Sequence, residues 1–251
     1  IPADYATELL TIINALNDMD QKDVEYDTGT RGIGVLVSDT LMFQRAAPTP
    51  SDAHLSNLFG LAMPLVKHGI PVELVQMENL TQPGVLDNIK VLLLTYEGQK
   101  PLKPEYHDIL KEWIYSGGAL LYVDDGKDPY NHVREWWNEQ GANKTTPRDD
   151  LFARLNLDAT AVNTPVQIGT GWVRVLENAP SFLAKETDGA DTLIRLVSVL
   201  LEKKGETLKT QNYLKLRRGP YVMAAVMDES VSEEPLHLAG RFVDMLDPML
   251  P

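Results

Sequence analysis

The stretch Gly117-Gly118-Ala119-Leu120-Leu121-Tyr122-Val123-Asp124-Asp125-Gly126 decides the fold of this chain. Two glycines end a helical pattern, an apolar run follows, and a turn with two carboxylates comes next. An apolar run without alternation is typical of a parallel strand that is buried on both faces. The stretch therefore predicts a buried strand over residues 119–123, whose carboxyl end presents Asp124 and Asp125.

Strand and helix patterns alternate on both sides of this strand. Further apolar strands are predicted at 33–38, 70–75 and 90–95, with a late pair at 166–169 and 171–176. Helices are predicted at 51–68, 104–115, 129–140 and 190–203. Strands separated by helices indicate a parallel sheet between two helical layers, so we predict an α/β, flavodoxin-like, three-layer fold.

The two ends of the chain carry different patterns. Residues 1–30 predict an amphipathic helix and a connector, and the helix must bury its apolar stripe on the following domain or on an upstream one. Two antiparallel strands are predicted within 213–227, and a third over 236–246. We therefore expect a helical lead-in over 1–30, an α/β domain over 31–205, and a β-rich segment over 206–251 that extends the α/β core or begins a small β domain.

Composition limits the classes of function. The chain has 251 residues, of which 43% are hydrophobic and 24% charged, as in ordinary globular proteins. Its net charge of -13 disfavours binding to nucleic acids and to anionic membranes, and no apolar run is long enough to span a bilayer. The absence of cysteine excludes disulfides and thiol catalysis. We expect a soluble bacterial protein. The sequence does not decide between the cytoplasm and a periplasmic or secreted location.

Residues 31–205 resemble the class I glutamine amidotransferase-like domain in the middle of family 42 glycoside hydrolases, the bacterial β-galactosidases. The resemblance rests on the strand that ends at Asp39, on residues 67–73 and 91–95, and on the helix, Gly-Gly and strand pattern of 110–121. In those hydrolases this domain lies between a catalytic TIM barrel and a small β domain. The resemblance implies a non-catalytic module that assembles an oligomer and shapes the mouth of the active site.

The same resemblance draws attention to Asp124. In class I glutamine amidotransferases the matching turn after the strand presents a catalytic cysteine, and here that position falls on about Asp124. Because the chain has no cysteine, that chemistry is absent. The hydrolytic carboxylates of family 42 enzymes lie on the barrel, and the eight-fold βα pattern of a barrel does not occur in this sequence.

A polar site at the sheet edge is the alternative to a purely structural role. The carboxyl ends of parallel strands meet at one edge, where open α/β proteins bind ligands. Residues that could line a pocket there are Asp39, Thr40, Gln44, Tyr96, Glu97, Asp124 and Asp125. A carboxylate in such a pocket can act as base or nucleophile, which makes Asp124, Asp39 and Glu97 candidate catalytic residues. Alternatively, one aspartate of the pair caps the turn, the other is solvated, and the loops bind nothing.

Two further residues are candidates for the same pocket. His132 is the histidine nearest in sequence to the aspartate pair, and the five histidines show no metal-ligand spacing such as HExxH. Trp136 and Trp137 cannot face the same side of a helix, so Trp136 is a candidate for stacking on a sugar, with core packing as the alternative. Glycine fingerprints for dinucleotides or phosphates do not occur, and we expect neither a cofactor nor a metal.

The sequence thus supports two functions. One is a non-catalytic module of a larger bacterial glycoside hydrolase-like protein, with further copies or neighbouring domains of the same polypeptide as partners. The other is a free-standing hydrolase or sugar-binding protein that takes carbohydrate in the polar pocket. A module should expose apolar faces on its first helix and on its C-terminal strands. An enzyme should have a closed pocket at the strand edge, with Asp124 buried.

Overall fold

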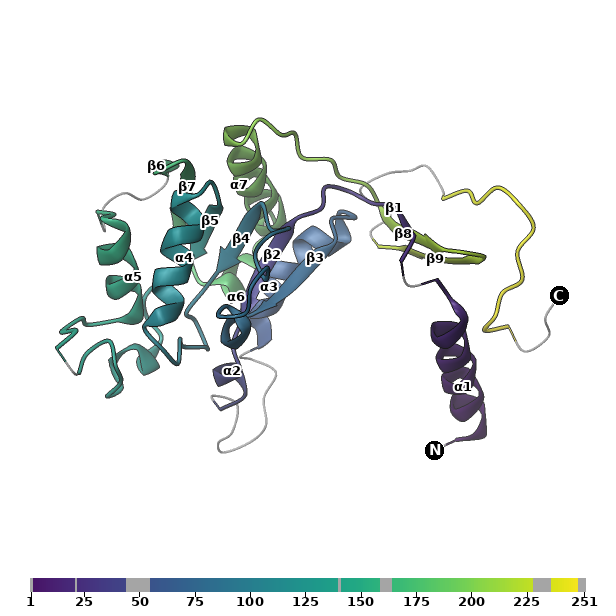
Figure 1. Ribbon diagram of the computed structural model, residues 1–251, viewed down its shortest axis with the longest axis horizontal. Coiled ribbons are helices and arrows are strands. Elements are labelled where there is room, and N and C mark those ends of the chain that lie inside the picture. The colour runs from purple at the N-terminus through teal and green to yellow at the C-terminus, as the bar shows by residue number, and fades with distance from the viewer. Residues whose placement is uncertain are drawn as a thin grey trace.

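The main body of the protein is a six-stranded, largely parallel sheet (Figure 1). The computed structural model describes residues 2–20, 22–43, 55–139, 141–158, 164–227 and 236–247. In spatial order the strands are β3 (Val72–Gln76), β2 (Ile33–Val37), β4 (Val91–Leu94), β5 (Ala119–Val123), β7 (Gly171–Leu176) and β6 (Val166–Ile168). All are parallel except β6, which forms an antiparallel pair with β7. This order is that of a flavodoxin-like sheet, so the predicted fold class is confirmed.

Helices cover both faces of the sheet. One face packs against α4 (Glu105–Tyr115) and α5 (Pro147–Leu155). The other packs against α3 (Leu55–Lys67), α6 (Pro180–Leu183) and α7 (Gly189–Lys203). Shorter elements connect them, namely α2 (Thr40–Phe43), the 3₁₀ turn η2 (Met77–Asn79) and the 3₁₀ turn η3 (Pro129–His132). None of the described helices combines the length and the apolar character that crossing a bilayer requires.

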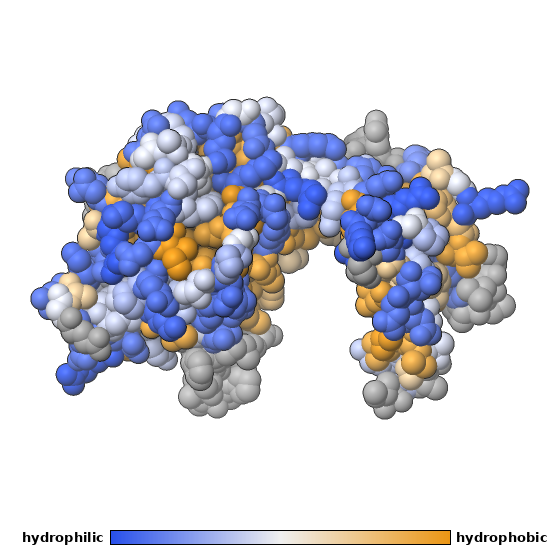
Figure 2. Space-filling view, in the orientation of Figure 1, coloured by the Kyte–Doolittle hydropathy of each residue, from blue (hydrophilic) through white to orange (hydrophobic). Residues whose placement is uncertain are grey.

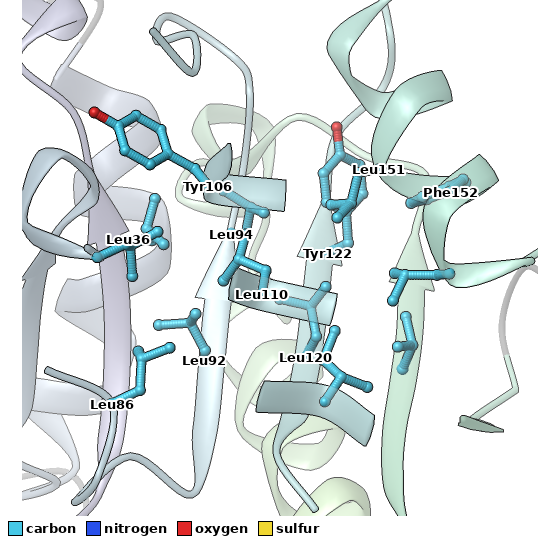
Figure 3. Close-up of a cluster of buried hydrophobic side chains, with 14 of the residues drawn as sticks. Leu36, Leu86, Leu92, Leu94, Tyr106, Leu110, Leu120, Tyr122, Leu151 and Phe152 are labelled. Carbon is cyan, nitrogen blue, oxygen red and sulfur yellow. The ribbon is translucent and has the colours of Figure 1, made fainter. Parts of the chain in front are cut away.

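The central strands β4 and β5 are buried along their whole length. Because successive side chains of a strand point to opposite faces, they alternate between two apolar clusters. Leu94 and Tyr122 pack with Leu110 of α4 and Phe152 of α5, as Figure 3 shows. Leu93, on the opposite face, packs with the helices α3 and α7. Each such side chain contributes about 1.5–3 kcal/mol to folding, so this double core is the main source of stability.

A second, three-stranded sheet lies beside this body (Figure 1). It consists of β1 (Val24–Asp27), β8 (Tyr213–Arg218) and β9 (Tyr221–Val226), all antiparallel. The hairpin of β8 and β9 confirms the prediction, whereas β1 falls in a segment that we expected to be a connector. The first helix, α1 (Ala3–Asp18), leads into this sheet and lies away from the α/β body. A hydrogen bond of 2.7 Å from Tyr221 Oη to Asp18 links the helix end to β9.

The helix predicted over 129–140 is wrong. Only the turn η3 is helical, and the chain then runs irregularly to residue 139. Both indoles explain the difference, because each donates a hydrogen bond to a carbonyl that a regular helix would leave out of reach. Trp136 Nε1 donates to Pro101 O at 2.8 Å, and Trp137 Nε1 donates to Asn131 O at 3.0 Å. Tertiary contacts of the side chains thus override the local helical pattern.

The strand predicted over 236–246 is also wrong. The described residues 236–247 contain no strand. Instead of pairing with an edge of the small sheet, this segment contributes to a cavity beside it. Leu238 and Phe242 line this cavity of about 410 Å³ together with Tyr26 and Val222 of the sheet.

A tight contact between α3 and α6 provides a test of the helical layer. A Cβ atom at Gly60 would lie 2.0 Å from the carbonyl oxygen of Pro180. We expect Gly60→Ala to lower the free energy of unfolding by about 1–3 kcal/mol, although alanine is the better helix former. Urea denaturation measures this change.

The matched control is Met63→Ala on the same helix. The Met63 side chain is exposed, so its truncation should change the free energy of unfolding by less than about 0.5 kcal/mol. Equal stability of Gly60→Ala and the parent protein would contradict the packing described for α3 and α6.

Candidate functional site

The point where the strand order reverses, between the carboxyl ends of β2 and β4, is where flavodoxin-like sheets bind ligands. In this protein the segment 95–101, which follows β4, fills that point. The side-chain amide of Gln99 is buried there and donates to Leu36 O at 3.0 Å and to Thr95 O at 2.9 Å. Its oxygen accepts a hydrogen bond of 2.8 Å from Ser38 N. The hydrogen-bonding groups of this crevice are therefore satisfied by the protein itself.

Thr40 and Lys100 extend this filling. Thr40 Oγ1 donates to Lys100 O at 2.9 Å and accepts from Lys100 N at 2.7 Å. The buried Lys100 ammonium pairs with Asp128 at 2.8 Å, and Gly98 N donates to the same carboxylate at 2.7 Å. The cavity that remains beside Glu97 measures about 10 Å³, which is about the space of one water molecule.

Three carboxylates meet at the neighbouring position of the edge, after β4 and β5. Glu97, Asp124 and Asp125 each offer an oxygen atom that lies within 4.8 Å of the other two. The strand register explains the meeting, because Leu94 lies opposite Tyr122 and the residues that follow reach the same level. Glu97 and Asp124 are buried and Asp125 is half-buried. Three of the candidate residues therefore form one cluster.

The two aspartates of the cluster have hydrogen-bond donors of their own. Asp124 accepts from Tyr122 Oη at 2.6 Å and from Gly126 N at 2.5 Å. Gly126 has a φ of 72°, a left-handed value that favours glycine, so Asp124 caps this turn. Asp125 accepts from Lys127 N at 3.0 Å and pairs with Lys127 Nζ at 3.3 Å. Capping, one of the two alternatives drawn from the sequence, thus describes Asp124.

Glu97 differs from both aspartates. Its Oε1 atom is buried and accepts no hydrogen bond from any residue that the structure describes. Burial, reinforced by the carboxylates of Asp124 and Asp125, raises the pKa of Glu97 to about 9. Burial also acts to raise the pKa of Asp125, but hydrogen bonds from Glu97 and Lys127 outweigh it and lower that pKa. In the absence of other ligands, Glu97 therefore holds a proton at neutral pH.

A buried chain of hydrogen bonds connects β4 with α4 and α5. Tyr96 Oη lies 2.5 Å from His107 Nε2, and His107 Nδ1 lies 2.8 Å from Asp150 Oδ2. Arg154 Nε donates to the same oxygen of Asp150 at 2.5 Å. Burial lowers the pKa of His107, although Asp150 acts in the opposite direction. The neutral ring therefore donates from Nδ1 to Asp150 and accepts at Nε2 from Tyr96.

This chain has the order of groups of a hydroxyl, imidazole and carboxylate relay. All three side chains are buried, so we interpret the chain as structural. Sequence analysis missed it because His107 lies 11 residues from Tyr96 and 43 from Asp150. Local spacing cannot reveal contacts of that kind.

Two of the four candidate catalytic residues lie outside the carboxylate cluster. Asp39 is exposed and accepts a hydrogen bond of 2.8 Å from Gln76 Nε2. His132 is also exposed, and it makes no hydrogen bond or ion pair with the described part of the chain. Gln44 lies outside the described residues.

Trp136 takes the packing role among its two alternatives. Its ring is half-buried and meets the His107 ring edge to face, with 5.2 Å between ring centroids. Its Nε1 atom is already bonded to Pro101 O. Both contacts are those expected for the packing alternative, and the sugar-binding alternative stays a prediction.

Comparisons with known proteins place the chain only distantly. No protein-family model and no curated protein matches the sequence. Among solved structures the chain is similar to the crystal structure of a β-galactosidase from Bacillus circulans sp. alkalophilus, with 12% sequence identity and a TM-score of 0.46. The match covers 76% of this chain and 35% of the β-galactosidase chain. This chain thus corresponds to about a third of that structure's length.

The raised pKa of Glu97 predicts a pH-dependent stability. The contribution of the protonated carboxyl is fully present below about pH 4.5 and is lost as the pH rises toward about 9. Glu97→Gln stays neutral and can still donate to the aspartates. In EDTA at pH 8.5 we expect the variant to exceed the parent protein by on the order of 2 kcal/mol in free energy of unfolding. Urea denaturation at pH 5.5 should show a smaller gap.

Asp39→Asn is the control for charge, because Asp39 is an exposed carboxylate at the same edge. Its difference from the parent protein should not change with pH over that range. If the free energy of unfolding fell by the same amount in the parent protein and in Glu97→Gln between pH 5.5 and 8.5, Glu97 would be ionised in the folded protein, against the prediction.

The buried relay predicts a large effect of His107→Phe. The substitution nearly preserves the ring volume but leaves Asp150 and Tyr96 Oη without the partner between them. We expect a loss of about 2–4 kcal/mol in free energy of unfolding, because Tyr96 Oη then stays unpaired and Asp150 keeps only its contact with Arg154. The exposed His132→Phe should change stability by less than about 0.5 kcal/mol. Similar small effects of both variants would contradict the structural role of His107.

Proposed function

We propose that this chain is a non-catalytic assembly module of a larger bacterial glycoside hydrolase-like protein, as its resemblance to the middle domain of family 42 enzymes implies. Its work is to bring copies of itself together. The observation that carries the proposal is the exposed apolar stripe of α1. The exposed fractions of four side chains on this stripe lie between 43% and 52%, those of Tyr5, Ile12, Ile13 and Leu16.

Helix α1 needs a partner for physical reasons. A helix of 16 residues is marginal in water unless its apolar face is covered. Its link to the rest of the chain includes the bond from Tyr221 to Asp18, which leaves the stripe open. Figure 2 shows hydrophobic surface on this helix, at the end of the molecule away from the α/β body. A second copy offers a stripe of the same pattern, so two helices can cover each other about a two-fold axis.

More apolar surface lies on the same half of the molecule. Strand β9 is an edge of the small sheet, and its Met223 and Val226 are exposed. The segment 236–247 adds Leu238, Phe242, Val243, Met245 and Leu246, all exposed. Exposed apolar side chains in such number are typical of a protein interface. It supports an interface that includes the small sheet as well as α1.

The sheet edge gives less support to a hydrolytic role. The ligand-binding crevice of the fold is filled by Gln99, and the cavity beside Glu97 is about 10 Å³. The carboxylates of a glycosidase stand about 5–5.5 Å or 6.5–9.5 Å apart to hold a sugar between them. Here one oxygen of each of the three carboxylates lies within 4.8 Å of the others, beside a cavity that is far too small for a sugar. The alternative of a hydrolase or sugar-binding protein therefore ranks second.

The oligomeric state tests this proposal. We expect the chain to form a dimer or a larger assembly at micromolar concentration, measured by size-exclusion chromatography with light scattering. Ile13→Glu places a charge in the middle of the α1 stripe, so it should shift the protein to monomer. Its unfolding temperature at low concentration should not fall, because Ile13 is exposed in the single chain.

Asn14→Glu is the matched control. It adds the same charge to the same helix at an exposed position beside Ile13 in sequence but on the polar side. The assembly should survive this change. A parent protein that stays monomeric at about 100 μM, well above the dissociation constants of stable dimers, would overturn the proposal.

A further inference from the structure

We propose that Glu97, Asp124 and Asp125 form a binding site for a hard divalent cation of the size of Ca²⁺. This inference goes beyond the assembly role and does not depend on it. The geometric basis is the cluster itself, in which one oxygen of each carboxylate lies within 4.8 Å of the others. Carboxylate oxygens are the ligands that Ca²⁺ and Mg²⁺ prefer in proteins.

The second observation is the state of Glu97. This side chain is 93% buried, its exposed fraction being 7%, and its carboxyl group faces the two aspartates. Its Oε1 atom receives no hydrogen bond from the residues that the structure describes. A buried acceptor without a donor costs about 1–3 kcal/mol, so native proteins rarely leave one unmatched. A cation placed among the three carboxylates supplies the missing partner.

The neighbouring cations do not fill this role. Lys100 is committed to Asp128, and its ammonium also donates to Tyr96 O. Lys127 is largely exposed and contacts Asp125 from the solvent side. The cluster carries two formal negative charges while Glu97 holds its proton, and a third when a bound cation displaces that proton, with one exposed ammonium beside them. A divalent cation balances that charge from within the cluster.

The number of carboxylates favours Ca²⁺ over Mg²⁺. Ca²⁺ takes several protein oxygens in a flexible geometry, whereas Mg²⁺ keeps several of its waters and usually binds only one or two carboxylates. Three carboxylates, each with one oxygen within 4.8 Å of the others, fit the ligand set of Ca²⁺. Asp125 is half-buried, which leaves one side of the cluster open to water ligands and to entry of the ion.

Hydrogen bonds also hold the carboxylate of Asp124 in place. Tyr122 Oη and Gly126 N hold one oxygen each, which fixes the direction of the carboxylate. Such outer contacts orient metal-binding carboxylates in proteins and contribute to affinity. We therefore leave Asp124 unchanged in the test, because its loss would also disturb the turn.

The test titrates the whole chain, stripped of metals with EDTA and then dialysed, with CaCl₂ or MgCl₂ at pH 7.5. We expect Ca²⁺ at millimolar concentration to raise the unfolding temperature by a few degrees, and calorimetry to show one site per chain. Mg²⁺ should give a smaller shift. Glu97→Gln and Asp125→Asn should each weaken Ca²⁺ binding at least about tenfold, since each removes a charged ligand.

Asp39→Asn is again the control, because it removes the same charge at the same edge outside the cluster and should bind Ca²⁺ like the parent protein. Three outcomes would overturn the proposal. The first is that neither cation, at up to about 10 mM, shifts the unfolding temperature of the parent protein, since this concentration is above the range of weak calcium sites. The second is that Glu97→Gln and Asp125→Asn respond to Ca²⁺ as strongly as the parent protein. The third is that Asp39→Asn loses binding to the same extent as these variants, which would indicate general screening of the acidic surface.

Discussion

The structure depends on the burial of β4 and β5 on both faces. Apart from the hydroxyl of Tyr122, which donates to Asp124, the side chains along these strands are apolar, and charged and amide groups gather at the carboxyl edge that follows them. That edge is itself covered, and its groups must find partners within the protein. Gln99 bridges to the backbone of two strands, and Lys100 neutralises Asp128. The polar arrangement at the edge is thus a consequence of how deeply the central strands are buried.

The buried carboxylates at this edge differ in their hydrogen-bond partners. Asp124 has two donors and Asp128 has an ammonium and an amide. Glu97 stands apart because the described residues offer its Oε1 no donor. The chemical interest of the site therefore concentrates on what completes the carboxylate cluster, a proton or a cation. At the neighbouring switch point, the filled crevice leaves a cavity of about 10 Å³.

Much of the fold could be predicted from sequence because the pattern is strong where strands are buried on both faces. Residues 119–123 form β5 as predicted, and β8 and β9 form the predicted antiparallel hairpin. Predictions failed where side-chain contacts decide, as for 129–140, where Trp136 bonds to the distant carbonyl of Pro101 and Trp137 to that of Asn131. Helix α5 was overlooked although Thr146 and Asp149 form a capping box that its sequence signals. At the site, the meeting of Glu97 with the aspartate pair was predictable from topology, but the burial that raises its pKa was not.

The two halves of the molecule obey different constraints, and this contrast is the physical argument for an assembly role. In the α/β body, apolar side chains from both helical layers close over the sheet, and the polar edge is matched internally. In the half formed by α1 and the small sheet, the apolar stripe of the helix faces water. A sheet of three short strands has little core of its own. It therefore needs a packed face to be stable. Conformational entropy opposes an ordered helix whose stripe is unburied, so covering this stripe would favour the helix. A partner that buries the stripe would therefore stabilise the helix and join the molecules in the same step.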